Sequence, residues 1–473
     1  MQIKFVASLA GALLMLTGCA INTPQPDASV AMPATWNTQT RNEDWPSADW
    51  WRAYQAPALD ALLEQARLGN LDLATSAAQL LQADAQLQQA GASLLPQVSG
   101  SFSASRSQSE NQTSSQTSSN RSSFGAALNA SYEVDFWGRN RATVESARAT
   151  LQASRFDRET LGLGIDASVA STWFQWLEVQ ERLALARRSL DNAERVLQLI
   201  DARQRFGAAD QLEVSQQRTL VLQLRASLPA LEQSELQLRN ALALLLGTAP
   251  GERMPATETL GTLVVPEIGA GLPAELLARR PDIRASEARL AAANADLNAA
   301  RAALYPSIQL TGQLGVQSLA LSGLVNDPTS TWNLVAGLTQ PIFQGGRLRA
   351  QVDLSEARQQ ELLVDYRRTV LQALQDADTA LGAVYQARVR FALLEQATAE
   401  AQRAFELAET RYRAGAITQQ SLLDTQRTWY QSQDTLLQQR SAWLQSTVDL
   451  FRALGGGWQE PALSYAEPPR PGE

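Results

Sequence analysis

The chain of 473 residues contains no histidine, one cysteine (Cys19) and one lysine (Lys4). Without histidine there is no imidazole for a Ser-His-Asp triad, a His general base or a His-ligated metal site. A single cysteine excludes an intrachain disulfide and a cysteine cluster that binds a metal. The net charge of −8 disfavours nucleic acid as a partner, because phosphate binding needs a basic surface. These absences predict a protein that is not an enzyme and that needs no metal or cofactor.

Long apolar runs are also missing after the N-terminus, where no stretch reaches the roughly 20 residues of a membrane-spanning helix. Residues 1–18 are typical of a signal peptide, with Lys4 followed by a short apolar segment from Phe5 to Leu16. This segment ends at Leu16-Thr17-Gly18-Cys19, which resembles the bacterial lipobox. We therefore expect Cys19 to be the acylated first residue of the mature chain. The alternative is an ordinary signal peptide with an incidental cysteine.

Residues 19–57 are predicted to form the lipid anchor and an extended N-terminal segment, because proline and polar residues dominate it. Ala20, rather than Asp, follows the cysteine. By resemblance to lipoprotein sorting in enteric bacteria, this residue favours the outer membrane over the inner membrane.

Comparison of the chain with itself shows five motifs that recur in the same order at an offset of about 207 to 210 residues. The pairs are Asn70-Leu71-Asp72-Leu73 with Arg280-Pro281-Asp282-Ile283, Ala92 to Pro96 with Ala302 to Pro306, Phe136 to Arg139 with Phe343 to Arg347, Arg205 to Ala208 with Arg413 to Ala416, and Leu244 to Gly247 with Arg452 to Gly455. The order predicts a duplication. Repeat 1 covers 58–250 and repeat 2 covers 274–455, with a connector at 251–273 and a tail at 456–473.

Each repeat changes its hydrophobic period along its length. A helical stretch of about 35 residues (59–95 and 274–304) ends at Pro96 or Pro306. Apolar residues then alternate with Ser, Thr, Asn and Gln at a period of two, which predicts a hairpin of two strands in each repeat. The expected strands are 97–106, 121–134, 307–317 and 331–343, close to the ~9–11 residues of a membrane β-strand. A half-buried hairpin of a soluble domain is the alternative.

Very long helices are predicted next, because 139–206 and 347–413 contain no proline. About 67 residues at ~1.5 Å each give a helix of about 100 Å. Apolar residues every three to four positions favour coiled-coil-like packing on neighbouring helices. Gly207 and Gly415 are predicted to end these helices in tight turns, from which antiparallel helices return over 211–246 and 419–454.

Four strands cannot close a barrel, and a sheet in lipid cannot leave open edges, so the chain must oligomerise if its strands cross a membrane. The sequence resembles the TolC-like outer-membrane factors, specifically the efflux lipoproteins typified by NodT and OprM. The resemblance runs from about Trp50 to Trp458. The motifs that carry it are Asp49-Trp50-Trp51, Leu59-Asp60, Asn70 to Leu73, Arg279 to Glu287, Gln340 to Arg347, Arg411 to Gly415, Leu422 to Arg427 and Ala453 to Trp458.

The resemblance implies a mainly α-helical protein with a transmembrane β part. Three copies would form a 12-stranded β-barrel in the outer membrane and a 12-helix α-barrel in the periplasm. The implied function is a passive exit duct of a tripartite efflux pump, whose partners are a periplasmic adaptor and an inner-membrane transporter of the resistance-nodulation-division or ABC type. An exit duct for type I protein secretion is the alternative, and a soluble periplasmic coiled-coil scaffold is a more distant one.

The resemblance also assigns roles to residues near the two glycine turns. Contact with the adaptor is assigned to Arg205, Gly207, Ala208, Arg413, Gly415 and Ala416. Asp424 and Arg427 match positions of the family's periplasmic gate, although an i, i+3 ion pair on the helix surface is an alternative. Gln420 stands where relatives often have leucine, which predicts a leakier or a hydrogen-bonded closure rather than a hydrophobic one. For the two glycines, helix capping alone is an equal alternative.

Overall fold

The computed structural model describes residues 22–38, 45–110, 118–251 and 258–458. Cys19 and the predicted signal peptide lie outside the described residues, and so does most of the predicted tail. The chain divides into two compact units. The first unit draws its residues from 1–29, 79–155 and 285–367, and the second from 30–78, 156–284 and 368–473.

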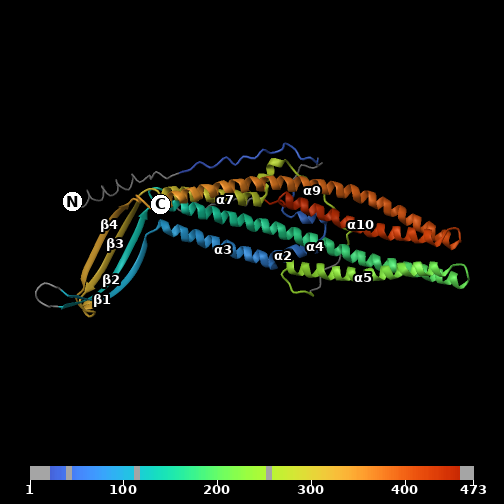
Figure 1. Cartoon of the computed structure of the whole chain (residues 1–473), viewed down its shortest axis with the longest axis horizontal. Helices are drawn as coiled ribbons and strands as arrows, with labels where there is room; N and C mark the ends of the chain where they lie inside the picture. Colours follow the sequence, from blue (N-terminus) through green and yellow to red (C-terminus); the bar gives the residue numbers. More distant parts are fainter. Residues whose placement is uncertain (1–21, 39–44, 111–117, 252–257, 459–473) are drawn as a thin grey trace. The chain divides into compact units, whose positions relative to one another are not determined.

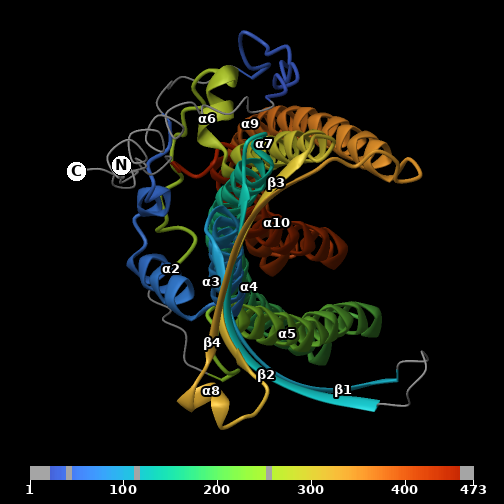
Figure 2. The ribbon, with the colours of Figure 1, turned by 90° about the vertical axis from the view of Figure 1, so that its left-hand side faces the viewer.

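A four-stranded antiparallel sheet in the first unit has its strands in chain order (Figure 1). The strands are β1 (Gln97–Glu110), β2 (Ser118–Val134), β3 (Ser307–Ser318) and β4 (Thr329–Thr339). β1 and β2 extend beyond their predicted bounds, because the polar residues after 106 still pair as far as Glu110 with Ser118. β4 ends before its predicted bound of 343, because Pro341 has no N–H for the strand ladder. A short helix, α8 (Gly323–Asn326), lies in the connection from β3 to β4 (Figure 2).

The register of the sheet places the even-numbered residues of all four strands on one face. Leu128 is opposite Leu314, and Leu314 is opposite Trp332. Their exposed fractions are 57%, 62% and 79%, so this apolar face is uncovered. The opposite face carries mainly serine, asparagine, glutamine and threonine. Within the described residues, the outer edges of β1 and β4 have no strand partner, so the sheet is open at both sides.

The helical segment before the first strand pair is broken once, whereas the sequence predicted one helix over 59–95. α2 (Pro57–Gly69) and α3 (Leu71–Gly91) are separated at Asn70, and a 3-10 turn (Ala92–Leu94) leads to β1. Asn70 has an extended backbone, with φ −65° and ψ 128°. Its side chain accepts hydrogen bonds from the N–H groups of Asp72 and Leu73, so it caps the start of α3.

The corresponding segment of the second half is also broken, in place of the predicted helix 274–304. A 3-10 turn (Pro273–Glu275) and α6 (Leu276–Arg279) precede α7 (Pro281–Ala302). Proline at the first position of α7 cannot donate to the preceding turn, so the helix restarts there.

Two helices of 67 residues, α4 (Arg139–Arg205) and α9 (Arg347–Arg413), contribute to both units. Each is followed by an antiparallel helix of 35 residues, α5 (Gln211–Leu245) or α10 (Gln419–Ala453). α5 runs beside α4 and α10 beside α9 (Figure 1), and a side-chain hydrogen bond joins each pair, from Gln217 to Ala193 and from Thr398 to Ser432. Among the described residues, no helix is both long and apolar enough to cross a lipid bilayer.

The largest core of the second unit brings together α2, α4, α5, α10 and a 3-10 turn at Trp50–Tyr54. Tyr54 is fully buried, lies 5.1 Å from Phe174 between ring centroids, and forms a 2.7 Å hydrogen bond with Thr447. Trp173 and Phe174 of α4 are also fully buried in this core. The aromatic residues thus fix the helices of this unit to one another.

The N-terminal segment over 22–38 has no helix or strand, but side chains hold it in place. In the first unit, Arg301 of α7 donates to the hydroxyl of Thr23 at 2.7 Å. In the second unit, the Asn37 amide donates to Asp378 of α9 at 2.8 Å. Over 22–38 the segment thus has no regular secondary structure and is bound to the helices, whereas the predicted extended segment 19–57 also contains the 3-10 turn at Trp50–Tyr54.

Candidate functional site at the helical turns

The turns after the two long helices have the same backbone. Gly207 and Gly415 have φ of +73° and +71°, values that glycine adopts without steric cost. The N–H of Ala208 donates to the carbonyl five residues earlier at 2.8 Å, and Ala416 does the same at 2.8 Å. This arrangement is the Schellman ending of a helix. The glycines therefore cap helices, and a Cβ added at either would meet nothing within 4 Å.

All six residues predicted to contact an adaptor are exposed at these turns: Arg205, Gly207, Ala208, Arg413, Gly415 and Ala416. Phe206 was not among the predicted residues, yet it is 88% exposed between the arginine and the glycine of the first turn. The signal that could have identified Phe206 is an aromatic residue next to the glycine of a turn. The second turn has Ala414 at the matching position, so the two turns present different surfaces.

One turn of helix before Gly415, Tyr412 connects three helices and is only 2% exposed. Its hydroxyl donates to Glu213 of α5 at 2.8 Å, and its carbonyl accepts from the Arg203 guanidinium of α4 at 2.7 Å. That guanidinium also lies 4.6 Å from the centre of the tyrosine ring. Burial, and then the hydrogen bond to Glu213, raise the pKa of Tyr412, so its hydroxyl remains a donor at neutral pH. Tyr412 lies in the family motif Arg411 to Gly415, but no role was predicted for it.

The three residues predicted to form the gate lie near the start of α10, and all are exposed. The Gln420 amide donates to Asp424 at 2.9 Å. Within the described part of the chain, no ion pair joins Asp424 to Arg427. Gln420 thus hydrogen-bonds within its own helix, and the hydrogen-bonded closure of the gate stays a prediction.

Fully buried amides lie beneath this surface. Gln217 of α5 donates to the Ala193 carbonyl at 3.1 Å and to the Gln426 side chain of α10 at 3.2 Å. Gln426 in turn donates to the Tyr430 hydroxyl at 2.9 Å. This series of hydrogen bonds could not be predicted from the sequence, because glutamine in a helix is usually exposed.

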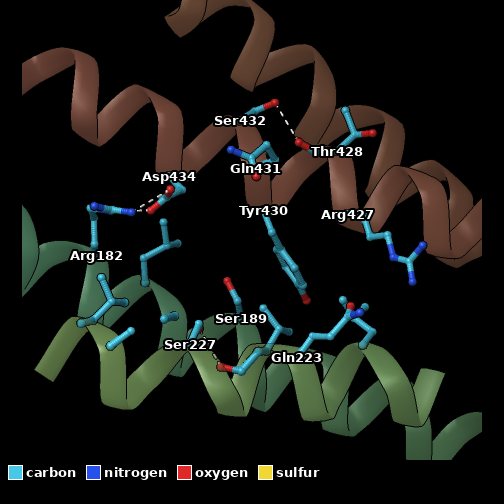
Figure 3. A pocket seen from close by; sticks show the side chains of 16 residues that line it. Arg182, Ser189, Gln223, Ser227, Arg427, Thr428, Tyr430, Gln431, Ser432 and Asp434 are labelled. Atoms are coloured by element: carbon cyan, nitrogen blue, oxygen red, sulfur yellow. Dashed lines mark hydrogen bonds and ion pairs between the residues drawn. The ribbon is translucent and has the colours of Figure 1, made fainter. Parts of the chain in front are cut away.

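A groove of about 820 Å³ lies between α4, α5 and α10 (Figure 3). On one side Arg182 of α4 forms a two-bond ion pair with Asp434 of α10, at 2.6 and 3.1 Å. Arg427 is on the other side, and the Tyr430 hydroxyl points into the space between them (Figure 3). This site joins the first and second halves of the chain, so no single motif predicted it.

The family of this chain follows from a match to a family model. The model of the outer membrane efflux protein family matches residues 62–248 and 272–456. The chain belongs to the outer membrane efflux protein family. The two matched segments each cover one of the predicted repeats, with the connector between them.

Relatives of this outer membrane efflux protein match over nearly their whole length. The pyoverdine export outer membrane protein OpmQ of Pseudomonas aeruginosa is 43% identical over 461 residues, which cover 96% of this chain and 97% of the relative. OpmQ of Pseudomonas putida is 43% identical over 455 residues, covering 94% and 96%. The efflux pump protein TtgC of Pseudomonas putida is 33% identical over 466 residues, covering 97% and 96%.

Solved structures agree with this assignment. The outer-membrane channel OprN superposes with a TM-score of 0.85 at 27% identity, covering 93% of this chain and 99% of that one. The open state of the Neisseria gonorrhoeae MtrE channel gives 0.83 at 30% identity, covering 93% and 98%.

The family assignment confirms the predicted resemblance to TolC-like efflux proteins and the predicted location in the outer membrane, extending into the periplasm. It also confirms the general role in efflux. The family is one of channels rather than enzymes.

Proposed function

We propose that three copies of this protein form the exit duct of a tripartite efflux pump. The duct would passively carry small molecules from a periplasmic adaptor and an inner-membrane transporter to the outside. The observation that carries the proposal is the open four-stranded sheet, whose uncovered face is apolar and whose two edges are unpaired in the described structure. Lipid would cover the face, and neighbouring copies would pair with the edges, giving twelve strands.

Exposed apolar residues on the helices support contact with further copies. On α9, Leu371, Tyr385, Leu393 and Leu407 recur at intervals of 14, 8 and 14 residues, and their exposed fractions are 55%, 47%, 61% and 61%. Intervals near multiples of seven favour packing along a neighbouring helix. The proposed assembly would bury this row in a periplasmic barrel of twelve helices.

Aromatic side chains at the helix-proximal end of the sheet support its position in a membrane. Trp137 stacks on Tyr305 with ring centroids 4.8 Å apart and donates to the Pro306 carbonyl at 2.7 Å. Aromatic residues gather at the interface between lipid and water. We propose that acyl chains on Cys19 add to this anchoring. A Cys19→Ser variant should then lack acyl chains in mass spectrometry, and an acylated variant would exclude this site.

We propose that the turns at Gly207 and Gly415 contact the adaptor and that Asp424, Arg427 and Gln420 line the gate. The double variant Asp424→Ala/Arg427→Ala should raise the single-channel conductance of the purified trimer in planar bilayers. Arg218→Ala is the matched control, because it removes an exposed arginine of α5 at the same level along the helices as Arg427. Unchanged conductance in the double variant would show that these residues do not form the gate, and the proposed duct function would still stand.

For the cargo, we propose a molecule of the pyoverdine class, because the pyoverdine export relatives are 43% identical and the solvent and antibiotic pump relatives 31–33%. The test expresses this chain in a Pseudomonas putida strain without its pyoverdine export outer membrane protein and measures pyoverdine in the medium and the periplasm. Restored export supports the proposal. Restored toluene tolerance in a strain without its toluene efflux duct, but no pyoverdine export, contradicts it. Secretion of a protein through a type I system would favour the alternative duct.

A further inference from the structure

The groove between α4, α5 and α10 has a lining suited to one kind of ligand. Its volume of about 820 Å³ lies within the ~300–1,000 Å³ of small-molecule sites. Leu220 and Leu224 of α5 contribute apolar surface to its floor, which α4 extends with Leu185. Leu185 and Leu220 are already buried and Leu224 is half-buried, so they offer a flat apolar body a packed surface to contact rather than a large area to remove from water.

The charged side chains of the lining favour an anion. They are Arg182, Arg427 and Asp434, and Arg182 also pairs at 3.3 Å with Glu178 of its own helix, so two carboxylates offset the Arg182 charge. Asp434 is already neutralised, because both of its oxygens accept from Arg182. Arg427 forms no ion pair among the described residues. One guanidinium is therefore available to an acidic group in a protein whose overall charge is −8.

The Tyr430 hydroxyl supplies a second donor next to Arg427. These residues are three apart on α10, so their side chains are neighbours on one face of the helix. The Tyr430 oxygen accepts from Gln426, which accepts from Gln217. Hydrogen bonds in such a chain polarise one another, which strengthens the O–H at its end as a donor. Within the described structure this O–H has no acceptor, and it points into the groove (Figure 3).

Three of the four other hydroxyl groups of the lining are already engaged as donors, and the Ser189 hydroxyl is the fourth. Thr428, Ser432 and Ser227 each donate to a carbonyl of their own helix, at 2.8, 2.8 and 2.7 Å. Arg427, Tyr430 and Ser189 are left as donors, and the amides of Gln223 and Gln431 also lie in the lining. The lining thus combines these donors with the apolar side chains of α4 and α5.

We propose that this groove binds an amphiphilic organic anion. The acidic group lies between the Arg427 guanidinium and the Tyr430 hydroxyl, and the apolar body lies on Leu185, Leu220 and Leu224. The site goes beyond the proposed duct function, because binding is measured on the purified protein without any transport. Failure of the binding test therefore leaves the duct proposal standing, and failure of the transport tests leaves this site standing.

The test uses the full-chain protein in lipid nanodiscs and two probes of one shape, 6-bromo-2-naphthoate and its uncharged carboxamide. Calorimetric titration should show naphthoate binding at least about tenfold more tightly than the carboxamide, since hydrogen bonds to a charged acceptor are stronger than those to a neutral one. Anomalous scattering from soaked crystals should place bromine over the leucines. No binding by the unmodified protein, or equal affinity for the two probes, overturns the proposal.

Three variants locate the acidic group. Tyr430→Phe keeps the ring and removes only the hydroxyl, and it should weaken naphthoate binding by about tenfold. Arg427→Gln should weaken binding by a similar factor. Arg218→Gln, the matched arginine of α5 outside the groove, should change the affinity by less than about twofold. Unchanged affinity in Tyr430→Phe or in a correctly assembled Arg427→Gln overturns the proposal, and Tyr430→Phe decides alone if Arg427→Gln fails to assemble.

Discussion

Near the glycine turns, the two halves of the chain share a backbone but differ in their side chains. The second half supplies aromatic residues there: Phe405 and Tyr412 on α9, and Trp429 and Tyr430 on α10. At the positions 208 residues earlier, the first half has Leu197, Gln204, Val221 and Leu222. Phe405 stacks on Trp429 with ring centroids 4.9 Å apart and planes at 14°. The second half thus provides the large surfaces, and the first half packs aliphatic side chains against them.

A second difference concerns charge. In the first half Arg67 of α2 forms a two-bond ion pair with Asp166 of α4, at 3.2 and 2.6 Å. The matching positions of the second half hold Leu277 and Leu374. Leu374 packs against an apolar cluster that includes Ala377 and Leu381. The second half therefore has leucines where the first half has an ion pair, at a place where the short helix α6 stands for the longer α2.

The largest effect on stability is expected from the aromatic residues of the second half. Tyr412→Ala should lower the free energy of unfolding by about 4 kcal/mol, because it empties a buried site and leaves Glu213 without its hydrogen bond. Gln204→Ala at the matching position should cost less than about 1 kcal/mol, since this side chain is only half-buried. Guanidinium unfolding followed by far-ultraviolet circular dichroism measures both, and equal losses would remove the distinction between the halves.

The next largest effect on stability is expected from the ion pair between Arg67 and Asp166 in the first half. Arg67→Ala should cost about 3 kcal/mol, because it leaves the buried Asp166 carboxylate without its partner. The double variant Arg67→Leu/Asp166→Leu, which copies the second half, should change stability by less than about 1 kcal/mol. The same unfolding assay applies. A double variant as unstable as the single one would show that the two halves are not interchangeable at this site.

The same carboxyl group predicts a smaller, pH-dependent effect. Burial raises the pKa of Asp166 above its ordinary value of 3.8, although Arg67 opposes this shift. The folded state then holds the proton more tightly than the unfolded state, so this group stabilises the fold fully below pH ~3.8, and the contribution is lost as pH rises through the folded pKa. In Arg67→Ala the loss should extend to higher pH. Unfolding measured from pH 3 to pH 7 against Asp166→Asn, which lacks this slope, isolates the contribution.

The smallest and most symmetrical effect is expected at the turns. Gly207→Ala and Gly415→Ala should each cost about 1–2 kcal/mol, because both residues have positive φ and neither has a steric neighbour. Equal thermal shifts in the two variants would support a purely backbone role. A much larger loss of adaptor binding than of stability, measured with the purified adaptor, would instead indicate a contact role.

Much of the backbone could be predicted because its signals are local. Pro96 and Pro306 mark where helix gives way to strand, period-two alternation marks the strands, and Gly207 and Gly415 mark the turns. Predictions were less accurate where a single residue interrupts a pattern. Asn70 divides a helix because its side chain caps the next one, and Pro341 shortens β4 because it lacks an N–H.

The candidate site was predictable only in part. Composition and family motifs led to the exposed turn residues and to Asp424, whereas Tyr412, Gln217 and the groove depend on side chains from helices far apart in the sequence. Gln217 and Gln426, for example, are 209 residues apart and form a buried hydrogen bond. Nothing in either local sequence distinguishes a buried glutamine from an exposed one.

The sequence by itself determined the absence of histidine and cysteine chemistry, the duplication, the order of strands and helices, and the positions of the turns. These follow from the conformations that each short segment can adopt. Tertiary structure alone decided which polar side chains meet: Tyr412 with Glu213, Gln217 with Gln426, and Arg182 with Asp434. The physical reason is that hydrogen bonds and ion pairs depend on distances of about 3 Å, which only the packing of distant segments fixes.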